Sequence, residues 1–167
     1  EVTLSLRVPH GSLRLLLSAN ASAPRAHLMR APRENPMTAP AFCMLLRKHL
    51  AGGRVVSVRQ PGFERVIDLC VESYTELGEL TQKHLILELM GRHSNLILTG
   101  EGGRILDSIK HVDFTVSSVR QVLPGLTYEV PPPQDKENPL TVSAERISEL
   151  AESVPANAKP ERWVVDT

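Results

Sequence analysis

The sequence predicts an α+β fold, mainly antiparallel, in which short strands form a β-sandwich or barrel-like domain. Apolar and polar residues alternate over several short runs, and turns rich in glycine or proline separate these runs. One early helical pattern interrupts the strands, and the sequence lacks the strand–helix–strand rhythm of a parallel sheet. A small helical segment is expected to follow this domain.

The first strands are expected before residue 30. Apolar and polar residues alternate over residues 2–8, which predicts a half-buried strand. A turn at residues 9–12 leads into a second apolar run at 13–17, so the two runs form a predicted hairpin. Residues 27–29 are expected to form a short third strand.

A proline-rich connector, residues 31–40, is expected to lead into the helix. Three prolines in ten residues exclude a helix or a central strand there. We expect Thr38 or Ala39 to cap the helix, with Pro40 in its first turn and Gly52–Gly53 at its end. Five residues at spacings of three and four form its expected inner face: Phe42, Leu45, Leu46, His49 and Leu50.

The remaining strands are expected after this helix. Residues 54–59, 64–72 and 104–110 read as strands, and residues 76–82 read as a polar loop. The stretch 83–99 contains two further strand-like apolar runs, Leu85–Met90 and Leu96–Leu98. These two runs are expected to pair as a hairpin or to continue through a bulge.

Five polar or small residues, Gly91 to Asn95, separate these two apolar runs. Gly91 permits a positive φ or a close backbone approach. The guanidinium of Arg92 beside the imidazole of His93 and the amide of Asn95 would suit a phosphate or a carboxylate. The alternative is a polar hairpin tip that only faces water, and the residues alone leave both open.

A change in composition places a domain boundary near residue 130. Residues 1–130 form the predicted β-rich domain, and residues 131–138 form a proline-rich linker that starts with three prolines. Residues 139–167 form the start of a helical segment, with Ser143 as the cap and Ile147 among the residues of the apolar face. The terminal residues 163–167 are too few to assign.

The amino-acid composition limits what kind of core and what kind of partner the chain is expected to have. With 41% hydrophobic and only 4% aromatic residues, the core is expected to be aliphatic. Residues 1–125 hold 15 Lys and Arg against 11 Asp and Glu, whereas residues 126–167 hold 4 against 8. A body this mildly basic neither requires nor excludes a nucleic-acid partner.

The cysteines and the apolar runs of the sequence also indicate in which cellular compartment the protein is expected. Cys43 and Cys70 lie in apolar patterns and are expected to be buried thiols of a reducing compartment. No apolar run approaches the roughly 20 residues that span a bilayer, and no signal peptide is visible. The chain opens at Glu1 without Met, so we expect it to be a piece whose true N-terminus is absent.

Motifs for catalysis, metals and cofactors are missing from the sequence. There is no phosphate-binding glycine loop, no Cys-x-x-Cys and no His-Glu-x-x-His, so no metal and no cofactor is expected. Ser94 follows His93, but adjacency does not make a nucleophile and its base. Asp107, His111 and Asp113 could cluster, most simply at a solvated strand end. The domain is therefore expected not to be an enzyme.

Basic and imidazole groups recur where predicted elements end. If the sheet brings several onto one surface, they would follow a phosphate backbone, and otherwise they form an ordinary mixed-charge surface. Few aromatic residues are available for base stacking, so RNA would be contacted through backbone and shape. The candidates are Arg47, Lys48, Arg65, Arg92, His93, Lys110, His111 and Arg120.

Five stretches together resemble one family. They are residues 41–54 (AFCMLLRKHLAGGR), 60–66 around Phe63-Glu-Arg, 87–98 (LELMGRHSNLIL), 107–111 (DSIKH) and 118–125 (SVRQVLPG) with Tyr128 and Pro131–Pro132. This pattern is similar to the amino-terminal domain of the NFACT family, of the bacterial RqcH type, which is related to eukaryotic NEMF proteins. The resemblance covers nearly the whole chain.

The resemblance implies a cytoplasmic, RNA-binding domain of a ribosome quality-control factor. Such factors bind obstructed large ribosomal subunits with peptidyl-tRNA and recruit tRNA for template-free alanine tailing. Eukaryotic members carry an Asp-Arg pair important for tRNA recruitment, and the matching pair here is Gly91–Arg92, so only Arg92 carries that role over. The implied RNA contacts are Gly91, Arg92, His93 and Asn95, with Arg47, Lys48, Arg65, Lys110 and Arg120 around them.

Two further expectations follow from the resemblance. The fold should be similar to the amino-terminal domain of formamidopyrimidine-DNA glycosylases, followed by a segment like their helix–two-turn–helix. Glycosylase activity is not expected, because Glu1–Val2 offers no amino-terminal proline nucleophile. Because bacterial members are also named fibronectin-binding proteins, a surface adhesin that binds fibronectin is the alternative function. Two thiols and the absence of an export signal argue mildly against it.

Overall fold

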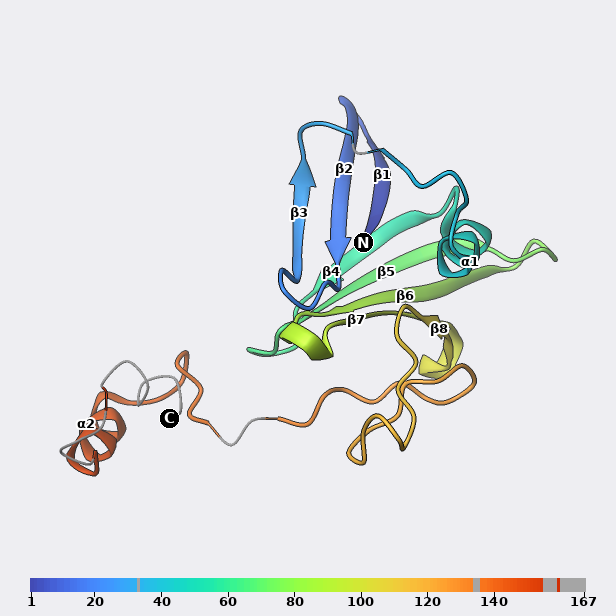
Figure 1. Cartoon of the computed structure of the whole chain (residues 1–167). Coiled ribbons are helices and arrows are strands. Elements are labelled where there is room, and N and C mark those ends of the chain that lie inside the picture. Colours follow the sequence, from blue (N-terminus) through green and yellow to red (C-terminus); the bar gives the residue numbers. More distant parts are fainter. Residues whose placement is uncertain (33, 134–135, 155–158, 160–167) are drawn as a thin grey trace. The chain divides into compact units, whose positions relative to one another are not determined.

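The computed structural model describes residues 1–32, 34–133, 136–154 and 159. They divide into two compact units, one within Glu1–Pro131 and one within Pro132–Thr167. The first unit contains two antiparallel sheets and a helix (Figure 1). The predicted α+β, mainly antiparallel class is therefore confirmed. The expected likeness to the glycosylase domain stays a prediction.

The smaller sheet contains three antiparallel strands in sequence order. Leu4 pairs with Leu15, and Leu15 pairs with Leu28, so one face of this sheet is aliphatic. The predicted hairpin and third strand are confirmed, and the third strand is longer than residues 27–29. The strands are β1 (Val2–Val8), β2 (Gly11–Ser18) and β3 (Arg25–Met29).

The α-helix of the first unit, α1 (Ala41–Leu50), lies where the sequence predicts it. Its cap is Pro40 rather than Thr38 or Ala39, because Pro40 has an extended backbone (φ −59°, ψ 152°) that cannot belong to the first turn. No side chain caps the helix. Phe42 and Leu46 are buried, as the spacing requires.

The larger sheet contains five strands, each antiparallel to its neighbour and in sequence order. The central β5–β6–β7 strands are the most buried, which matches their nearly continuous apolar sequences. The predicted hairpin between the two apolar runs is confirmed. The strands are β4 (Arg54–Arg59), β5 (Val66–Tyr74), β6 (Leu80–Glu88), β7 (Asn95–Thr99) and β8 (Ile105–Ser108).

Two boundaries differ from the predicted ones. Residues 76–82 were expected to be a loop, but β6 already begins at Leu80, which pairs with Tyr74. The polar sequence there is overridden by backbone pairing, because β5 and β6 run together as a long ribbon. The predicted strand 104–110 is shorter, since β8 ends at Ser108 and the next residues turn toward β7.

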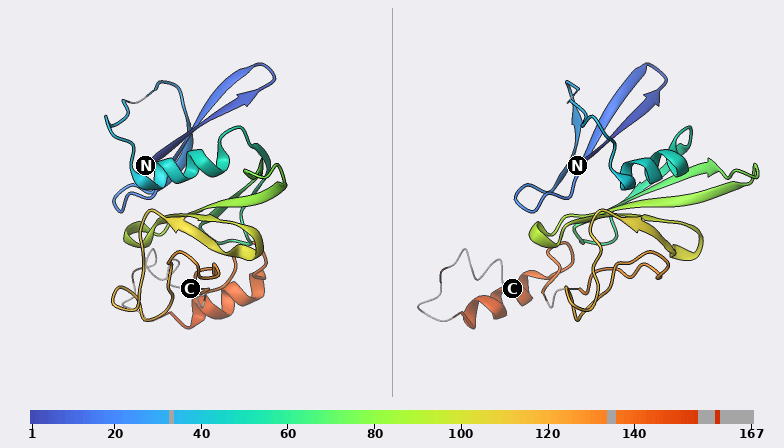
Figure 2. Two further views of the ribbon diagram at one scale, coloured as in Figure 1. Left: turned by 90° about the vertical axis from the view of Figure 1, so that its right-hand side faces the viewer. Right: turned by 45° about the vertical axis from the view of Figure 1, so that its right-hand side comes forward.

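The two faces of the five-stranded sheet pack against different parts of the chain (Figure 2). On one face, side chains of β5, β6 and β7 such as Leu69, Leu85 and Leu98 pack with Leu17 of β2 and Leu46 of α1. On the other face, a second cluster is covered by the segment that follows β8. Its buried members are Val66, Ile86, Ile97, Ile105 and Val122.

The second unit contains the helix α2 (Ala144–Glu152), within the predicted helical segment 139–167. Ser143 caps it as predicted, because its Oγ accepts a hydrogen bond from the backbone N–H of Arg146 at 3.2 Å. Residues 163–167 lie outside the described residues. Neither described helix is long and apolar enough to cross a bilayer.

Candidate nucleic-acid interface

The candidate site is the loop Leu89–Ser94 between β6 and β7. Residues Gly91–His93 form one turn of 3₁₀-helix rather than an open hairpin tip. Gly91 has a φ of +54°, in the left-handed region that side chains disfavour, so glycine suits this position. The turn presents Arg92 and His93 to solvent side by side, and the Arg92 Nε donates a hydrogen bond to the His93 Nε2 at 2.9 Å.

Backbone and hydroxyl groups hold this loop in one shape. Ser94 is fully buried, and its Oγ accepts a hydrogen bond from the Met90 N–H at 2.8 Å. The His93 N–H donates to the Met90 carbonyl, and the Ser94 N–H donates to the Gly91 carbonyl, both at 3.0 Å. Ser94 is therefore an internal brace of the turn, and its hydroxyl is not available as a nucleophile.

Asn95, a predicted RNA contact, is instead part of the scaffold. It is 2% exposed. Its amide N–H donates to the Lys110 carbonyl at 2.8 Å, and its Oδ1 accepts from the N–H groups of Lys110 and Leu96. These bonds fix the segment after β8 against the start of β7, so the Asn95 side chain positions Lys110 and is not exposed at the surface.

Lys110 joins the loop from a distant part of the sequence. Its Nζ donates to the Ser94 carbonyl at 2.7 Å and to the Arg92 carbonyl at 3.3 Å. Arg65 is exposed at the start of β5, and its carbonyl accepts the Leu89 N–H at 2.8 Å. One end of the five-stranded sheet thereby gathers four basic or imidazole side chains, Arg65, Arg92, His93 and Lys110. Among the residues that the structure describes, no carboxylate forms an ion pair with any of them.

Arg120 is also a scaffold residue. Its guanidinium forms two hydrogen bonds, at 2.8 and 2.7 Å, with the carboxylate of Glu88, which is fully buried. The Tyr128 hydroxyl donates to the same carboxylate at 3.0 Å, and Arg120 lies over the Tyr128 ring. Burial disfavours the charge on Arg120, but the Glu88 carboxylate outweighs it and raises the Arg120 pKa. Burial, with Glu88, raises the pKa of Tyr128.

Arg47 and Lys48 do not lie with the loop. The Lys48 Nζ forms an ion pair with Glu76, in the turn between β5 and β6, at 3.1 Å. That turn is at the opposite end of β6 from the loop, and the eight steps between the first and last of the nine residues of β6, at about 3.3 Å each, separate the two ends by roughly 25 Å. The predicted candidates therefore divide between two ends of the sheet.

The remaining groups that the sequence singled out are the possible cluster of Asp107, His111 and Asp113 and the two cysteines. The His111 Nε2 contacts the Asp107 Oδ1 at 2.6 Å at an exposed strand end, whereas Asp113 accepts bonds from Thr115 and Val116 in its own turn. Among the residues the structure describes, no group of three possible metal ligands exists. Cys70 is buried as expected, but Cys43 is only half-buried, and both thiols are free.

Sequence reasoning missed the Glu88–Arg120–Tyr128 network and the pair of Asp68 and His84 on neighbouring strands. The signal for Glu88 was a charged residue inside an otherwise apolar strand, which requires a buried partner. The signal for Asp68 and His84 was similar, because each interrupts an apolar run. The partner of Glu88 lies 32 residues away, so only the fold identifies it.

The chain matches, over residues 1–167, the family model described as NFACT N-terminal and middle domains. It is 42% identical over 148 residues to the Rqc2 homolog RqcH of Bacillus subtilis, and 38% identical over 160 residues to that of Streptococcus pneumoniae. These matches cover 88% and 95% of this chain but 26% and 29% of the relatives. The chain thus spans little more than a quarter of their length.

Solved structures show the same fold. The N-terminal domain of the fibronectin-binding protein PavA from Streptococcus pneumoniae superposes with a TM-score of 0.80 at 38% identity, over 92% of this chain and 57% of that one. The fibrinogen-binding protein from Staphylococcus aureus gives a TM-score of 0.82 at 31% identity, over 99% of this chain and 57% of that one.

Proposed function

The chain belongs to the NFACT family, as an N-terminal domain of the RqcH type, and from this membership we propose that it is the RNA-contacting domain of a ribosome quality-control factor. Its parent would bind obstructed large ribosomal subunits that carry peptidyl-tRNA. It would recruit tRNA for template-free alanine tailing of the stalled chain. The domain acts by binding rather than by catalysis, in the cytoplasm, where the ribosomes are.

The observation that carries this proposal is the braced turn Gly91–His93. A phosphate needs donors held at a fixed geometry, and Arg92 provides a planar fork of donors on a turn that is held by backbone hydrogen bonds and by the Ser94 hydroxyl. The Lys110 ammonium lies against the carbonyl groups beneath the same turn and adds a second positive charge. Arg92, His93, Lys110 and Arg65 thus form the proposed contact set, and Asn95 and Arg120 support it from inside.

The test is equilibrium binding of the parent protein to purified tRNA across a salt series. Because phosphate contacts release counterions, binding should weaken with salt, and Arg92→Ala should reduce both the affinity and the salt slope, by about one unit. Arg7→Ala removes another exposed arginine, on β1, and serves as the matched control. Full-strength binding by Arg92→Ala, or equal loss in both variants, would remove Arg92 from the contact set.

A second candidate function is a fibronectin-binding adhesin. It is favoured by one observation, the close structural likeness to a domain of a protein named for fibronectin binding. A binding experiment with the same parent protein, and with immobilised fibronectin in place of tRNA, distinguishes the two functions. Saturable binding to fibronectin together with no binding to tRNA or large subunits would put the adhesin first.

A further inference from the structure

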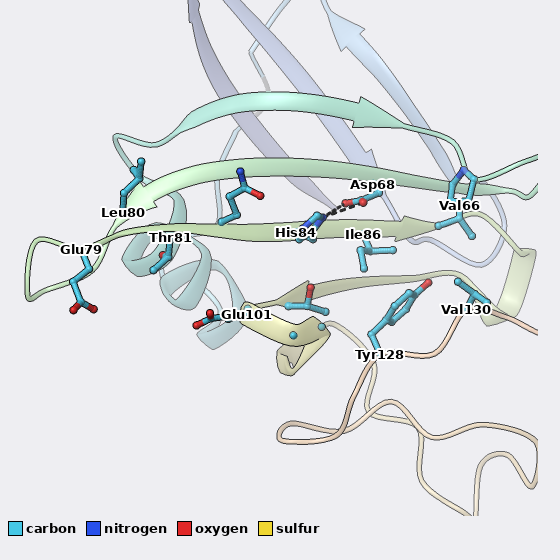
Figure 3. Close-up of a pocket in the computed structure, with 16 residues that line it drawn as sticks. Val66, Asp68, Glu79, Leu80, Thr81, His84, Ile86, Glu101, Tyr128 and Val130 are labelled. Atoms are coloured by element: carbon cyan, nitrogen blue, oxygen red, sulfur yellow. Dashed lines mark hydrogen bonds and ion pairs between the residues drawn. The ribbon is translucent and has the colours of Figure 1, made fainter.

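A depression separate from the Leu89–Ser94 loop lies on the face of the five-stranded sheet that the segment after β8 only partly covers (Figure 3). Its volume is about 810 Å³. The strands β5, β6 and β7 form its floor, the turn Gly100–Gly103 forms one wall, and Tyr128 and Val130 form another. This size falls within the range of sites that bind a few side chains or a small molecule.

The charged groups of this depression are carboxylates. Asp68, Glu79 and Glu101 line it, and the lining residues, all of them described, include neither Lys nor Arg. The only imidazole is that of His84, whose Nδ1 lies 2.9 and 3.0 Å from the two oxygens of Asp68. Arg59 lies opposite Asp68 in the register of β4 and β5, but it is not among the lining residues. The side chains that line the depression therefore carry more carboxylates than cations, which favours a cationic ligand over a phosphate.

The floor and rim are apolar between these carboxylates. Val66 and Ile86 are buried in the floor, whereas Leu80 and Val130 remain 57% and 60% exposed at the rim. The Tyr128 ring stands over the floor with its hydroxyl turned to Glu88. Aliphatic surface beside carboxylates suits lysine and arginine, whose hydrocarbon stems lie on apolar groups while their charged ends reach acceptors.

We propose that this depression binds a lysine- and arginine-rich peptide segment of a partner protein. A metal ion would need several close oxygen ligands, and the described carboxylates form no such group. A wholly apolar peptide would leave Glu79 and Glu101 without a partner. The charge complementarity and the mixed floor together favour the basic peptide. The proposal does not rest on RNA binding at the loop, because the two sites share no residue.

Titration of the 167-residue chain with a fluorescein-labelled peptide, Lys-Arg-Leu-Lys-Ala-Arg-Lys-Leu-Lys, tests this. The variant Glu79→Gln/Glu101→Gln should weaken binding about three- to tenfold, because two exposed ion pairs are lost. The control Glu34→Gln/Glu152→Gln changes net charge equally at exposed positions outside the depression and should keep wild-type affinity. Amide shifts in a nitrogen-15 spectrum should change around β5, β6 and residues 100–103.

Three results would overturn the proposal: no saturable binding, equal weakening in the control variant, or shift changes confined to residues outside the depression. The tRNA affinity of the variant Glu79→Gln/Glu101→Gln distinguishes a failure of this proposal from a failure of the proposed function. This affinity should equal that of the wild type whether or not the peptide binds in the depression. A failure of tRNA binding in the wild type would contradict the loop interface alone.

Discussion

At the scale of single residues, the polar groups around the Leu89–Ser94 loop divide into those that hold it and those that face solvent. Ser94, Asn95 and Glu88 are buried with their hydrogen bonds satisfied inside the protein. Arg92 and His93 are exposed. The residues that define the shape of the site are thus different from those that would contact RNA, and substitutions should separate stability from binding.

Arg120→Ala should be among the most destabilising single changes in the chain. It leaves the buried Glu88 carboxylate with only the Tyr128 hydroxyl, and breaking such a buried pair costs about 3–5 kcal/mol of unfolding free energy. Denaturant unfolding measures this. Arg14→Ala, at an exposed site of β2, should change stability by less than about 0.5 kcal/mol. A loss for Arg120→Ala as small as that of the control would contradict the structural role.

His49 should make stability depend on pH. Burial, with the nearby Lys83 and Lys48, lowers the pKa of His49 below its ordinary value of 6.5. The unfolded chain therefore binds a proton more readily, so this contribution is complete above about pH 6.5 and is lost as pH falls toward the lower folded pKa. Unfolding free energies from pH 8 to pH 5 should fall more steeply in the wild type than in His49→Gln. If the unfolding free energies of the wild type and of His49→Gln change with pH in parallel, His49 does not cause the pH dependence.

At the scale of elements, how much the sequence could predict depended on whether the decisive contacts were local. Alternation predicted the β1–β2 hairpin, and helical spacing predicted α1 and its buried residues. The start of β6 at Leu80 was missed because its reason is pairing with Tyr74 rather than its own polar sequence. The contacts of the candidate site residues could not be predicted in full, since the side chains of Asn95 and Arg120 form hydrogen bonds with partners 15 and 32 residues away.

Gly91 and Gly78 offer a matched test of the loop as an element. Both have a positive φ, +54° and +82°, and a Cβ at Gly78 would meet nothing within 4 Å. Alanine at either position should cost about 1 kcal/mol through backbone strain. Only Gly91→Ala should also weaken tRNA binding, because Gly78 lies in the turn at the opposite end of β6. Equal tRNA affinity of the two variants would contradict the proposal that the Leu89–Ser94 loop contacts tRNA.

At the scale of the whole molecule, both apolar clusters lie within Glu1–Pro131, whereas α2 contributes no buried residue among those described. The stability of the first unit should therefore not depend on the second. A chain that ends at Pro131 should unfold at the same denaturant midpoint as the full chain. The near-ultraviolet circular dichroism of its tyrosines measures this unfolding. A midpoint shifted by more than the experimental error would show that the two units stabilise each other.

The proposed function requires that tRNA contacts the end of the sheet that carries Arg92 and Lys110, and not the end near Lys48. The most direct measurement is photo-crosslinking of the parent protein on obstructed large subunits with tRNA, with the photoreactive amino acid in place of His93 or of Lys48. His93 lies on the proposed contact turn, whereas Lys48 forms an ion pair with Glu76 in the turn at the other end of β6. We expect a tRNA crosslink from position 93 and none from position 48. A crosslink from position 48 alone, or from neither position, would contradict it.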